Sequence, residues 1–257
     1  MLEDSILIEF KKSVAWITLN RPDVHNAFDE GLISLLHDTL EEIAVRDDIY
    51  AVVLSGAGKS FSAGADLNWM ARAANFTEEQ NKKDALKLAR MLNRLYTLPQ
   101  LTIACVHGAA MGGGLGLVAC CDIALATKQA VFSLSEVKLG LIPATIGPYV
   151  LRAVGERHAR RYFQTAERFD ADTAFSIGLV QDVSDTPEDM DKSLSGILES
   201  VAANGPLAMR ESKKLCLDLA GKSVTGAVIE DTAGRIAKTR CGGEARSRVS
   251  AFLEKKK

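Results

Sequence analysis

The sequence has little that would tie it to a membrane or to nucleic acid. Its formal net charge is -2, so it offers no broad basic field to a phosphate backbone. The first residues, MLEDSILIEF, have neither a basic start nor a long apolar stretch, so we expect no signal peptide and no membrane span. These absences predict a cytoplasmic protein without nucleic-acid or membrane partners.

Cysteine is scarce and shows no functional spacing. The five cysteines are an odd number, lie mostly in apolar surroundings and form no C-x-x-C pair; they are Cys105, Cys120, Cys121, Cys216 and Cys241. We expect reduced, buried, structural thiols. No His/Cys/Asp/Glu cluster has the spacing of a metal site, and no G-x-S-x-G elbow occurs, so we expect no metal.

The order of apolar patterns indicates an α/β protein. An alternating hairpin at the start is followed by an amphipathic helix at about 30 to 46, a buried strand AVVLSG and a helix from Glu78 to Leu98 that Pro99 stops. The strand LTIACV, a glycine-led helix and two more strands, DIALAT and AVFSLSEV, come next. From about residue 150 the pattern is helical. This order predicts an α/β core with an α-helical C-terminal part.

Three consecutive glycines stand between the strand LTIACV and the buried helix that follows it. Gly112, Gly113 and Gly114 are costly in conformational entropy, so the backbone there must approach something closely or adopt a positive φ. A helix that begins on glycines points its unpaired N–H groups outward, which suits an oxyanion. A second loop, SFSAGADL, also follows a strand and presents small residues, so the two loops together could hold one oxygen.

Three other interpretations of the glycines compete with an oxyanion site. GAGKS resembles the end of a phosphate-binding P-loop, but Val53 stands where that frame needs glycine. Gly114, Gly116 and Ala119 fit a dinucleotide fingerprint with Glu136 as its acidic residue, although HGAAM separates them from the strand. Finally, the glycines could serve only to pack a helix closely against a strand.

Three ordered motifs together resemble the enoyl-CoA hydratase/isomerase (crotonase) superfamily. They are FSAGADL, HGAAMGGGLGLVACCD and FSLSEVKLGLIP, and the resemblance extends over nearly the whole chain, from NRPDVHNAF to AFLEKKK. It implies a crotonase-like spiral of ββα repeats over residues 1–192, which holds the acyl-CoA site. Residues 193–257 would form an α-helical region for trimerisation, giving a homotrimer or a hexamer built as a dimer of trimers.

The resemblance also implies the residues of the site. The backbone N–H groups of Ala65 and Gly113 would hold the thioester oxygen of an acyl-CoA, where the charge of an enolate collects. No separate cofactor is expected, because coenzyme A is part of the substrate. Residues along the path of the CoA moiety would be Val24, His25, Ala27, Ala63, Asp66, Leu67, Asn68 and, from the C-terminal helix, Phe252 and Lys255. The alternative for these last two is a solvated helix end.

Glu136 is the candidate proton carrier. The alternation in VFSLSEV places its carboxyl group on the same face as Phe132 and Leu134. Desolvation there would raise its pKa and let it both accept and donate a proton. The alternative is a glutamate at a strand end that turns into water or pairs with Lys138. The resemblance places the second catalytic glutamate of the family on Glu136.

The sequence departs from the family at two positions. Hydratases of the family commonly carry a first glutamate two residues after the triple glycine, where Gly116 stands here, and ATIG replaces a usual GAGG after Pro143. With one carboxyl group, isomerisation by proton transfer from C4 to C2 is the simplest chemistry, and hydration on one glutamate also remains open. A homologue that has lost catalysis and binds acyl-CoA or RNA, or acts as a scaffold, is a further alternative.

A finer resemblance favours hydration. SAGADLNWM, SLSEVKLGLIPATIGPYV and GERHARRYFQTAERFDA are similar to bacterial methylglutaconyl-CoA hydratases of leucine and acyclic-terpene breakdown. We therefore expect a hydro-lyase that adds water to a branched, carboxylated 2-enoyl-CoA such as 3-methylglutaconyl-CoA. Arg72 or Lys138 would provide the cation for the distal carboxylate.

Overall fold

The computed structural model describes residues 5–254, which form two compact units. The first unit runs to Ile197 and the second begins at Leu198, so the division falls inside helix α7 (Pro187–Ala202).

A six-stranded sheet forms the base of the first unit. The antiparallel hairpin predicted at the start of the chain is confirmed, and every later strand of the sheet is parallel to its neighbour. Buried side chains at Ile17, Leu54 and Ala104 lie in neighbouring strands at matching register. In spatial order the strands are β1 (Ile6–Lys11), β2 (Val14–Leu19), β3 (Ala51–Gly56), β4 (Leu101–Val106), β6 (Ile123–Thr127) and β9 (Asp182–Ser184).

A smaller, three-stranded sheet carries the glycine-rich loop. It consists of β5 (Ala109–Met111), β7 (Val131–Ser133) and β8 (Phe169–Asp170). The strand predicted over AVFSLSEV is wrong beyond Ser133, because its partner β5 ends opposite that residue and no further ladder is available. Glu136 instead begins a short 3-10 helix, η3 (Glu136–Leu139), which Gly140 ends in the left-handed region at φ 72°.

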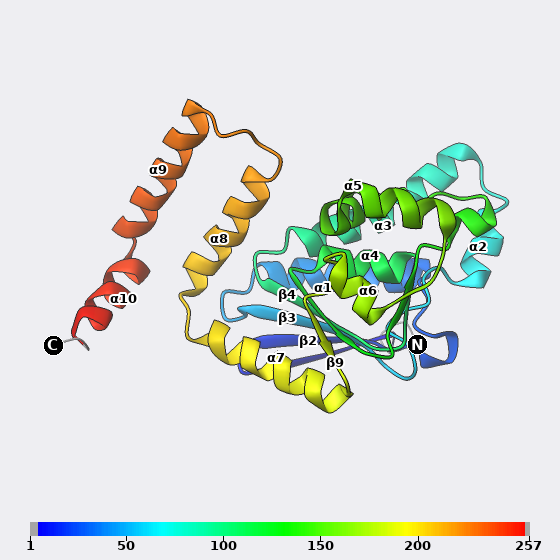
Figure 1. The fold of residues 1–257 in the computed structure, drawn as a ribbon, viewed down its shortest axis with the longest axis horizontal. Helices are drawn as coiled ribbons and strands as arrows, with labels where there is room; N and C mark the ends of the chain where they lie inside the picture. Colours follow the sequence, from blue (N-terminus) through cyan, green and yellow to red (C-terminus); the bar gives the residue numbers. More distant parts are fainter. Residues whose placement is uncertain (1–4, 255–257) are drawn as a thin grey trace. The chain divides into compact units, whose positions relative to one another are not determined.

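Helices cover the sheet of the first unit (Figure 1). The two predicted amphipathic helices are confirmed as α1 (Glu30–Ala44), which Asp29 caps, and α3 (Glu78–Tyr96), which begins with a capping box at Thr77. The remaining helices of this unit are α2 (Leu67–Ala73), α4 (Gly113–Cys120), α5 (Gly147–Thr165) and α6 (Ala171–Ser176).

Helix α4 lies at the centre of this arrangement. It packs against both α3 and α5, and in Figure 1 it lies between the strands and α5. Every residue from Gly114 to Cys120 is buried. A helix that is apolar on all sides is stable only inside a core, so its first turn is rigidly placed. The N-terminus of α4 is therefore a fixed reference point for the site.

The second unit is helical, as predicted for the C-terminal part. It contains α8 (Pro206–Leu219), α9 (Gly226–Cys241) and α10 (Gly243–Glu254). Arg235 joins α9 to α8 through an ion pair with Asp218 at 2.7 Å. The prediction that the cysteines are buried is wrong here, since Cys216 and Cys241 are exposed on these helices, whereas Cys105 and Cys120 are buried in the first unit.

Candidate active site

A cavity of about 290 Å³ lies where the two glycine-rich loops meet the segment that follows β7. Most of its walls are apolar, and its polar side chains come from Ser135, Glu136 and Thr145. Its lining consists of Phe28, Ala63, Gly64, Ala65, Leu67, Trp69, Met70, Leu88, Gly112, Gly113, Ser135, Glu136, Leu139, Leu141, Ile142, Pro143, Thr145 and Ile146.

The loop after β3 leaves one backbone donor free. The N–H groups of Ala63, Gly64 and Asp66 donate to acceptors inside the protein at 2.9, 3.3 and 2.8 Å. The N–H of Ala65 donates to no acceptor within residues 5–254. Ala65 is exposed and lines the cavity, so this donor is accessible to a ligand.

The glycine-rich loop likewise leaves a donor free. Met111 N–H donates to the carbonyl oxygen of Ser62, and Gly112 N–H donates to that of Ser133, both at 2.9 Å. The next residue, Gly113, is the first of α4, where an N–H has no partner within the helix. It finds no other acceptor in the described part of the chain, and it also lines the cavity.

The two loops are in direct contact. Gly64 has φ +90°, and a Cβ added to it would lie 2.8 Å from the carbonyl oxygen of Met111 and 3.7 Å from the nitrogen of Gly113. Only glycine fits at position 64 for both reasons. The two free N–H groups, at Ala65 and Gly113, therefore come from adjoining loops that share one cavity. This is the arrangement needed for an oxyanion site.

Glu136 carries the carboxyl group of the cavity. Burial raises its pKa, and its Oε2 is buried without a hydrogen-bond partner among the described residues. Its Oε1 lies close to the glycine-rich loop, since a Cβ on Gly112, whose φ is +47°, would be 3.1 Å away. A desolvated carboxyl group with an unused oxygen is suited to proton transfer.

Gly116, where the family's first glutamate would stand, faces an isoleucine. A Cβ at this position would lie 2.3 Å from Cγ2 and 2.9 Å from Cβ of Ile146. Ile146 is 1% exposed and belongs to the altered segment after Pro143. The two departures noted in the sequence are thus in contact, and Ile146 fills the space that a side chain at 116 would occupy.

The residues predicted along the CoA path are only partly brought to the cavity. Ala63 and Leu67 line it, and Leu67 is 81% exposed. Val24, His25 and Asn68 are exposed but are not part of the lining.

The remaining described residues that were predicted to contact CoA do not line the cavity either. Ala27 is buried, and the Asp66 carboxylate caps α2 by accepting hydrogen bonds from Asn68 N–H at 2.8 Å and Trp69 N–H at 3.3 Å. Phe252 is exposed on α10 in the second unit, and Lys255 lies outside the described residues.

Neither predicted cation lines the cavity. Arg72 pairs with Glu30 at 2.6 Å, and Lys138 is exposed on η3. No lysine or arginine belongs to the lining that the described residues form.

The apolar walls of the cavity were not predicted from the sequence. Trp69 and Met70 come from α2, a helix that was not predicted, although Asp66 followed by a short helical stretch is a capping signal. Trp69 also anchors α2 to α3, because its Nε1 donates to Asp84 Oδ2 at 3.0 Å. Leu139, Leu141 and Thr145 had no pattern that would place them.

Over residues 5–254, no helix has both the length and the apolar character needed to cross a bilayer. In the same range no group of three or more His, Cys, Asp or Glu side chains is arranged to hold a metal ion.

Comparisons with known proteins agree on one family. Residues 9–257 match the family described as Enoyl-CoA hydratase/isomerase. The crystal structure of an enoyl-CoA hydratase from Shewanella pealeana is 43% identical, with a TM-score of 0.95 over 98% of this chain and 94% of that one. A crotonyl-CoA hydratase of Syntrophomonas wolfei is 32% identical over 100% of this chain and 98% of that protein. A short-chain-enoyl-CoA hydratase of Clostridium acetobutylicum is 34% identical over 82% of this chain and 80% of that protein. The predicted crotonase-like α/β fold is confirmed.

Proposed function

The chain belongs to the enoyl-CoA hydratase/isomerase family of enzymes, and we propose that it adds water to a compact, branched 2-enoyl-CoA with Glu136 as its single proton carrier. The observation that carries this proposal is the Glu136 carboxyl group, whose Oε2 is buried and has no hydrogen-bond partner among the described residues, in the same cavity as the N–H groups of Ala65 and Gly113.

The two N–H groups account for activation of the substrate. When the thioester oxygen lies between Ala65 and Gly113, their hydrogen bonds strengthen as the enolate forms and negative charge moves onto that oxygen. Such donors are already oriented, so the transition state requires no reorganisation of them. Loss of one donor of this kind typically costs about 3 to 4 kcal/mol of transition-state stabilisation.

Glu136 then accounts for both proton transfers. As a carboxylate it takes one proton from water while the water oxygen forms a bond to C3. The π electrons of the C2=C3 bond move to the enolate. The neutral acid then returns a proton to C2 and the thioester carbonyl is restored. The raised pKa of Glu136 brings its two protonation states closer in free energy, which suits a group that must alternate between them.

For the acyl group we propose a short, branched chain such as that of 3-methylglutaconyl-CoA. The finer motif resemblance supports the branched, carboxylated chain, and the cavity of about 290 Å³ supports a compact one. Since the described residues that line the cavity include no lysine or arginine, a substrate carboxylate would be met by hydroxyl groups such as those of Ser135 and Thr145, or by solvent at the opening. Recognition would therefore depend on the shape of the branched chain more than on its charge.

The test uses matched substrates and matched variants. Purified protein is given crotonyl-CoA, 3-methylcrotonyl-CoA and 3-methylglutaconyl-CoA, and loss of enoyl absorbance is followed together with product mass. We expect a mass gain of one water, abolished by Glu136→Gln and retained by Glu156→Gln, an exposed control on α5. Removing the substrate carboxylate should change kcat/KM by less than about 100-fold, the loss expected for one hydrogen bond to a charged group, because no ion pair is lost. A larger drop would contradict recognition by shape.

Isomerisation is the second candidate, and the contact between Gly116 and Ile146 favours it. With that side of the cavity closed, Glu136 is the one carboxyl group in the lining that residues 5–254 form. A single group that removes a proton from C4 and returns it to C2 is sufficient for isomerisation. A shifted double bond without any gain in mass would select this reaction. Tight binding of acyl-CoA with no reaction at all would select a binding protein.

A further inference from the structure

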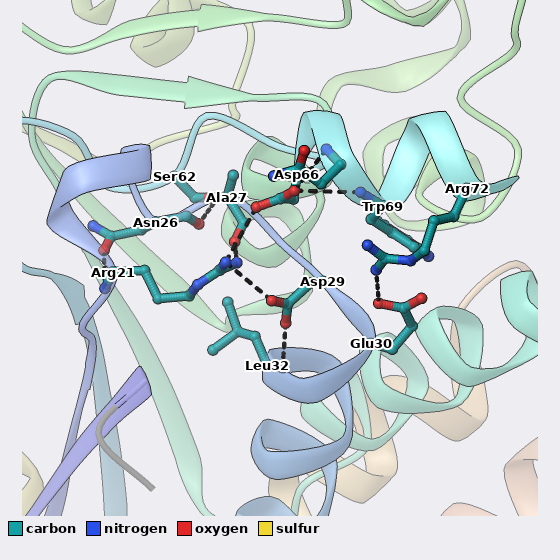
Figure 2. Close-up of polar contacts among 11 residues, drawn as sticks. Arg21, Asn26, Ala27, Asp29, Glu30, Leu32, Ser62, Asp66, Trp69 and Arg72 are labelled. Atoms are coloured by element: carbon teal, nitrogen blue, oxygen red, sulfur yellow. Dashed lines mark hydrogen bonds and ion pairs between the residues drawn. The ribbon is translucent and has the colours of Figure 1, made fainter. Parts of the chain in front are cut away.

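One arginine connects the segments that surround the Ala65 donor. The guanidinium of Arg21 donates to the carbonyl oxygen of Ala27 at 2.5 Å. It also pairs with Asp29 Oδ2 at 3.0 Å and with Asp66 Oδ2 at 3.1 Å. Figure 2 shows Arg21 lying between these three acceptors, which come from two segments far apart in the sequence. Its side chain is 20% exposed, so the contacts are largely shielded from water.

Both carboxylates that Arg21 holds are helix N-caps. Asp29 accepts the N–H of Leu32 and begins α1, while Asp66 begins α2. Burial alone would raise the pKa of Asp66, but hydrogen bonds from the backbone N–H groups of Trp69 and Asn68, together with the charge of Arg21, hold it below its usual range. The Asp66 carboxylate is charged and 7% exposed, and both of its oxygens are occupied: Oδ2 accepts from Arg21 Nη2 and Oδ1 accepts from the two backbone N–H groups. It is therefore a rigid attachment point.

Ala65 directly precedes Asp66, and the residues on both sides of it form backbone hydrogen bonds with Phe28. Phe28 N–H donates to the carbonyl oxygen of Gly64 at 2.6 Å, and Asp66 N–H donates to that of Phe28 at 2.8 Å. Ala65 is thus fixed on both sides to the segment that Arg21 holds through Ala27. The orientation of its free N–H depends on these contacts and on no hydrogen bond of its own.

We propose that Arg21 is a positioning residue that fixes the Ala65 N–H against the thioester oxygen. This inference rests on the proposed function, because it assigns Arg21 to the oxyanion site. Arg21 is absent from the cavity lining, so it would act through Asp66 and Ala27 without contacting the acyl group. A displacement of about 1 Å in a catalytic group can lower a rate about 100-fold, so we expect Arg21→Met to lower kcat by that order.

A second arginine provides a matched control. Arg72 also bridges α2 to α1, through Glu30 at 2.6 Å, but it lies at the far end of α2 and is more exposed (Figure 2). Arg72→Met removes a single, more exposed ion pair between α2 and the first residue of α1 and leaves Asp66 untouched. We expect this variant to keep the wild-type kcat with crotonyl-CoA, an uncharged acyl group.

The direct readout is the carbonyl of a bound, unreactive thioester. Butyryl-CoA labelled with ¹³C at the carbonyl is bound to each protein, and the carbonyl stretch is measured by infrared difference spectroscopy. We expect wild type and Arg72→Met to lower its frequency relative to the free ligand, and Arg21→Met to lose most of that shift. A full shift with unchanged kcat in Arg21→Met would overturn the inference, as would an equal loss in Arg72→Met.

Folding defects and failure of the proposed function are separable from this result. If Arg21→Met does not fold, Arg21→Lys is used instead. It keeps the charge but lacks the planar guanidinium that reaches three acceptors, so it should lose part of the carbonyl frequency shift. An intermediate shift supports the inference, and an unchanged shift in a folded Arg21→Lys contradicts it. Absence of any carbonyl shift in wild type would instead contradict the oxyanion site itself.

Discussion

The methyl group Cγ2 of Ile146 lies where a side chain at Gly116 would have to begin, 2.3 Å from the position of a Cβ. A contact this short has no room to relax without movement of α4 or α5, and both residues are buried. The pair thus closes one side of the cavity, and Glu136 is the one carboxyl group among the described residues of its lining.

The close packing at Gly116 predicts a stability cost for even one added methyl group. Gly116→Ala should lower the free energy of unfolding by about 1 to 3 kcal/mol, the usual cost of overpacking a core. Urea unfolding measures this loss. The double variant Gly116→Ala with Ile146→Ala should lose less unfolding free energy than the sum of the losses in the two single variants. Gly234→Ala on α9 is the control, since nothing lies within 4 Å of a Cβ there and a small gain is expected. An unchanged unfolding free energy in Gly116→Ala would show that Ile146 can move away from position 116.

Burial of Glu136 predicts a stability that depends on pH. Its pKa is raised above the usual 4.5 in the folded protein, so folding favours the neutral acid. The resulting penalty is absent below the unfolded pKa and grows as pH rises through the folded pKa. Glu136→Gln should therefore stabilise the protein at about pH 8 and give no gain at about pH 4, measured by urea unfolding at both values. Equal gains at both pH values would argue against a carboxylate that ionises in a buried site.

Ile146 is predicted to limit the acyl chain. Ile146→Ala enlarges the cavity beside Gly116 and should shift the ratio of kcat/KM values toward longer acyl groups, at a cost of about 2 to 5 kcal/mol in unfolding free energy. Val150→Ala is the matched control, because Val150 is buried on α5 and is not part of the lining. Steady-state kinetics with crotonyl-CoA and octenoyl-CoA would measure the ratio. The same change in chain preference in both variants would remove the special role of Ile146.

Trp69 is predicted to hold the wall that α2 contributes. Trp69→Phe keeps most of the ring but removes the hydrogen bond from Nε1 to Asp84, 3.0 Å long. We expect a loss of about 1.5 to 3 kcal/mol in unfolding free energy, typical of a hydrogen bond to a charged group. KM should rise while kcat changes little, because α2 lines the cavity but supplies no reacting group. If KM stays constant while stability falls, α2 has no part in binding.

The sequence predicted well what depends on local pattern. The hairpin of β1 and β2, the buried strands β3 and β4 and the helices α1 and α3 follow from periodicity and capping, which act over a few residues. The two loops were predicted as an oxyanion site from small residues that follow a strand, and the family resemblance singled out Ala65 and Gly113 within them. The structure places both of these residues and Glu136 in the lining of one cavity.

What the sequence could not predict depends on contacts between distant segments. Glu136 was assigned to a strand because Phe132 and Leu134 alternate with polar residues, but the strand ends at Ser133, where its partner β5 stops. No local pattern reveals that Ile146 covers Gly116, which is 30 positions earlier, or that Arg21 reaches Asp66. These contacts follow from the topology of the two sheets and the order of their loops.

The most direct test of the account is a single-turnover reaction of 3-methylglutaconyl-CoA in ¹⁸O-labelled water with wild type and Glu136→Gln, analysed by product mass. Wild type should give a product that carries one labelled oxygen. Glu136→Gln should bind the thioester with an unchanged carbonyl frequency shift but give no labelled product. Labelled product formed at the wild-type rate by Glu136→Gln would contradict it.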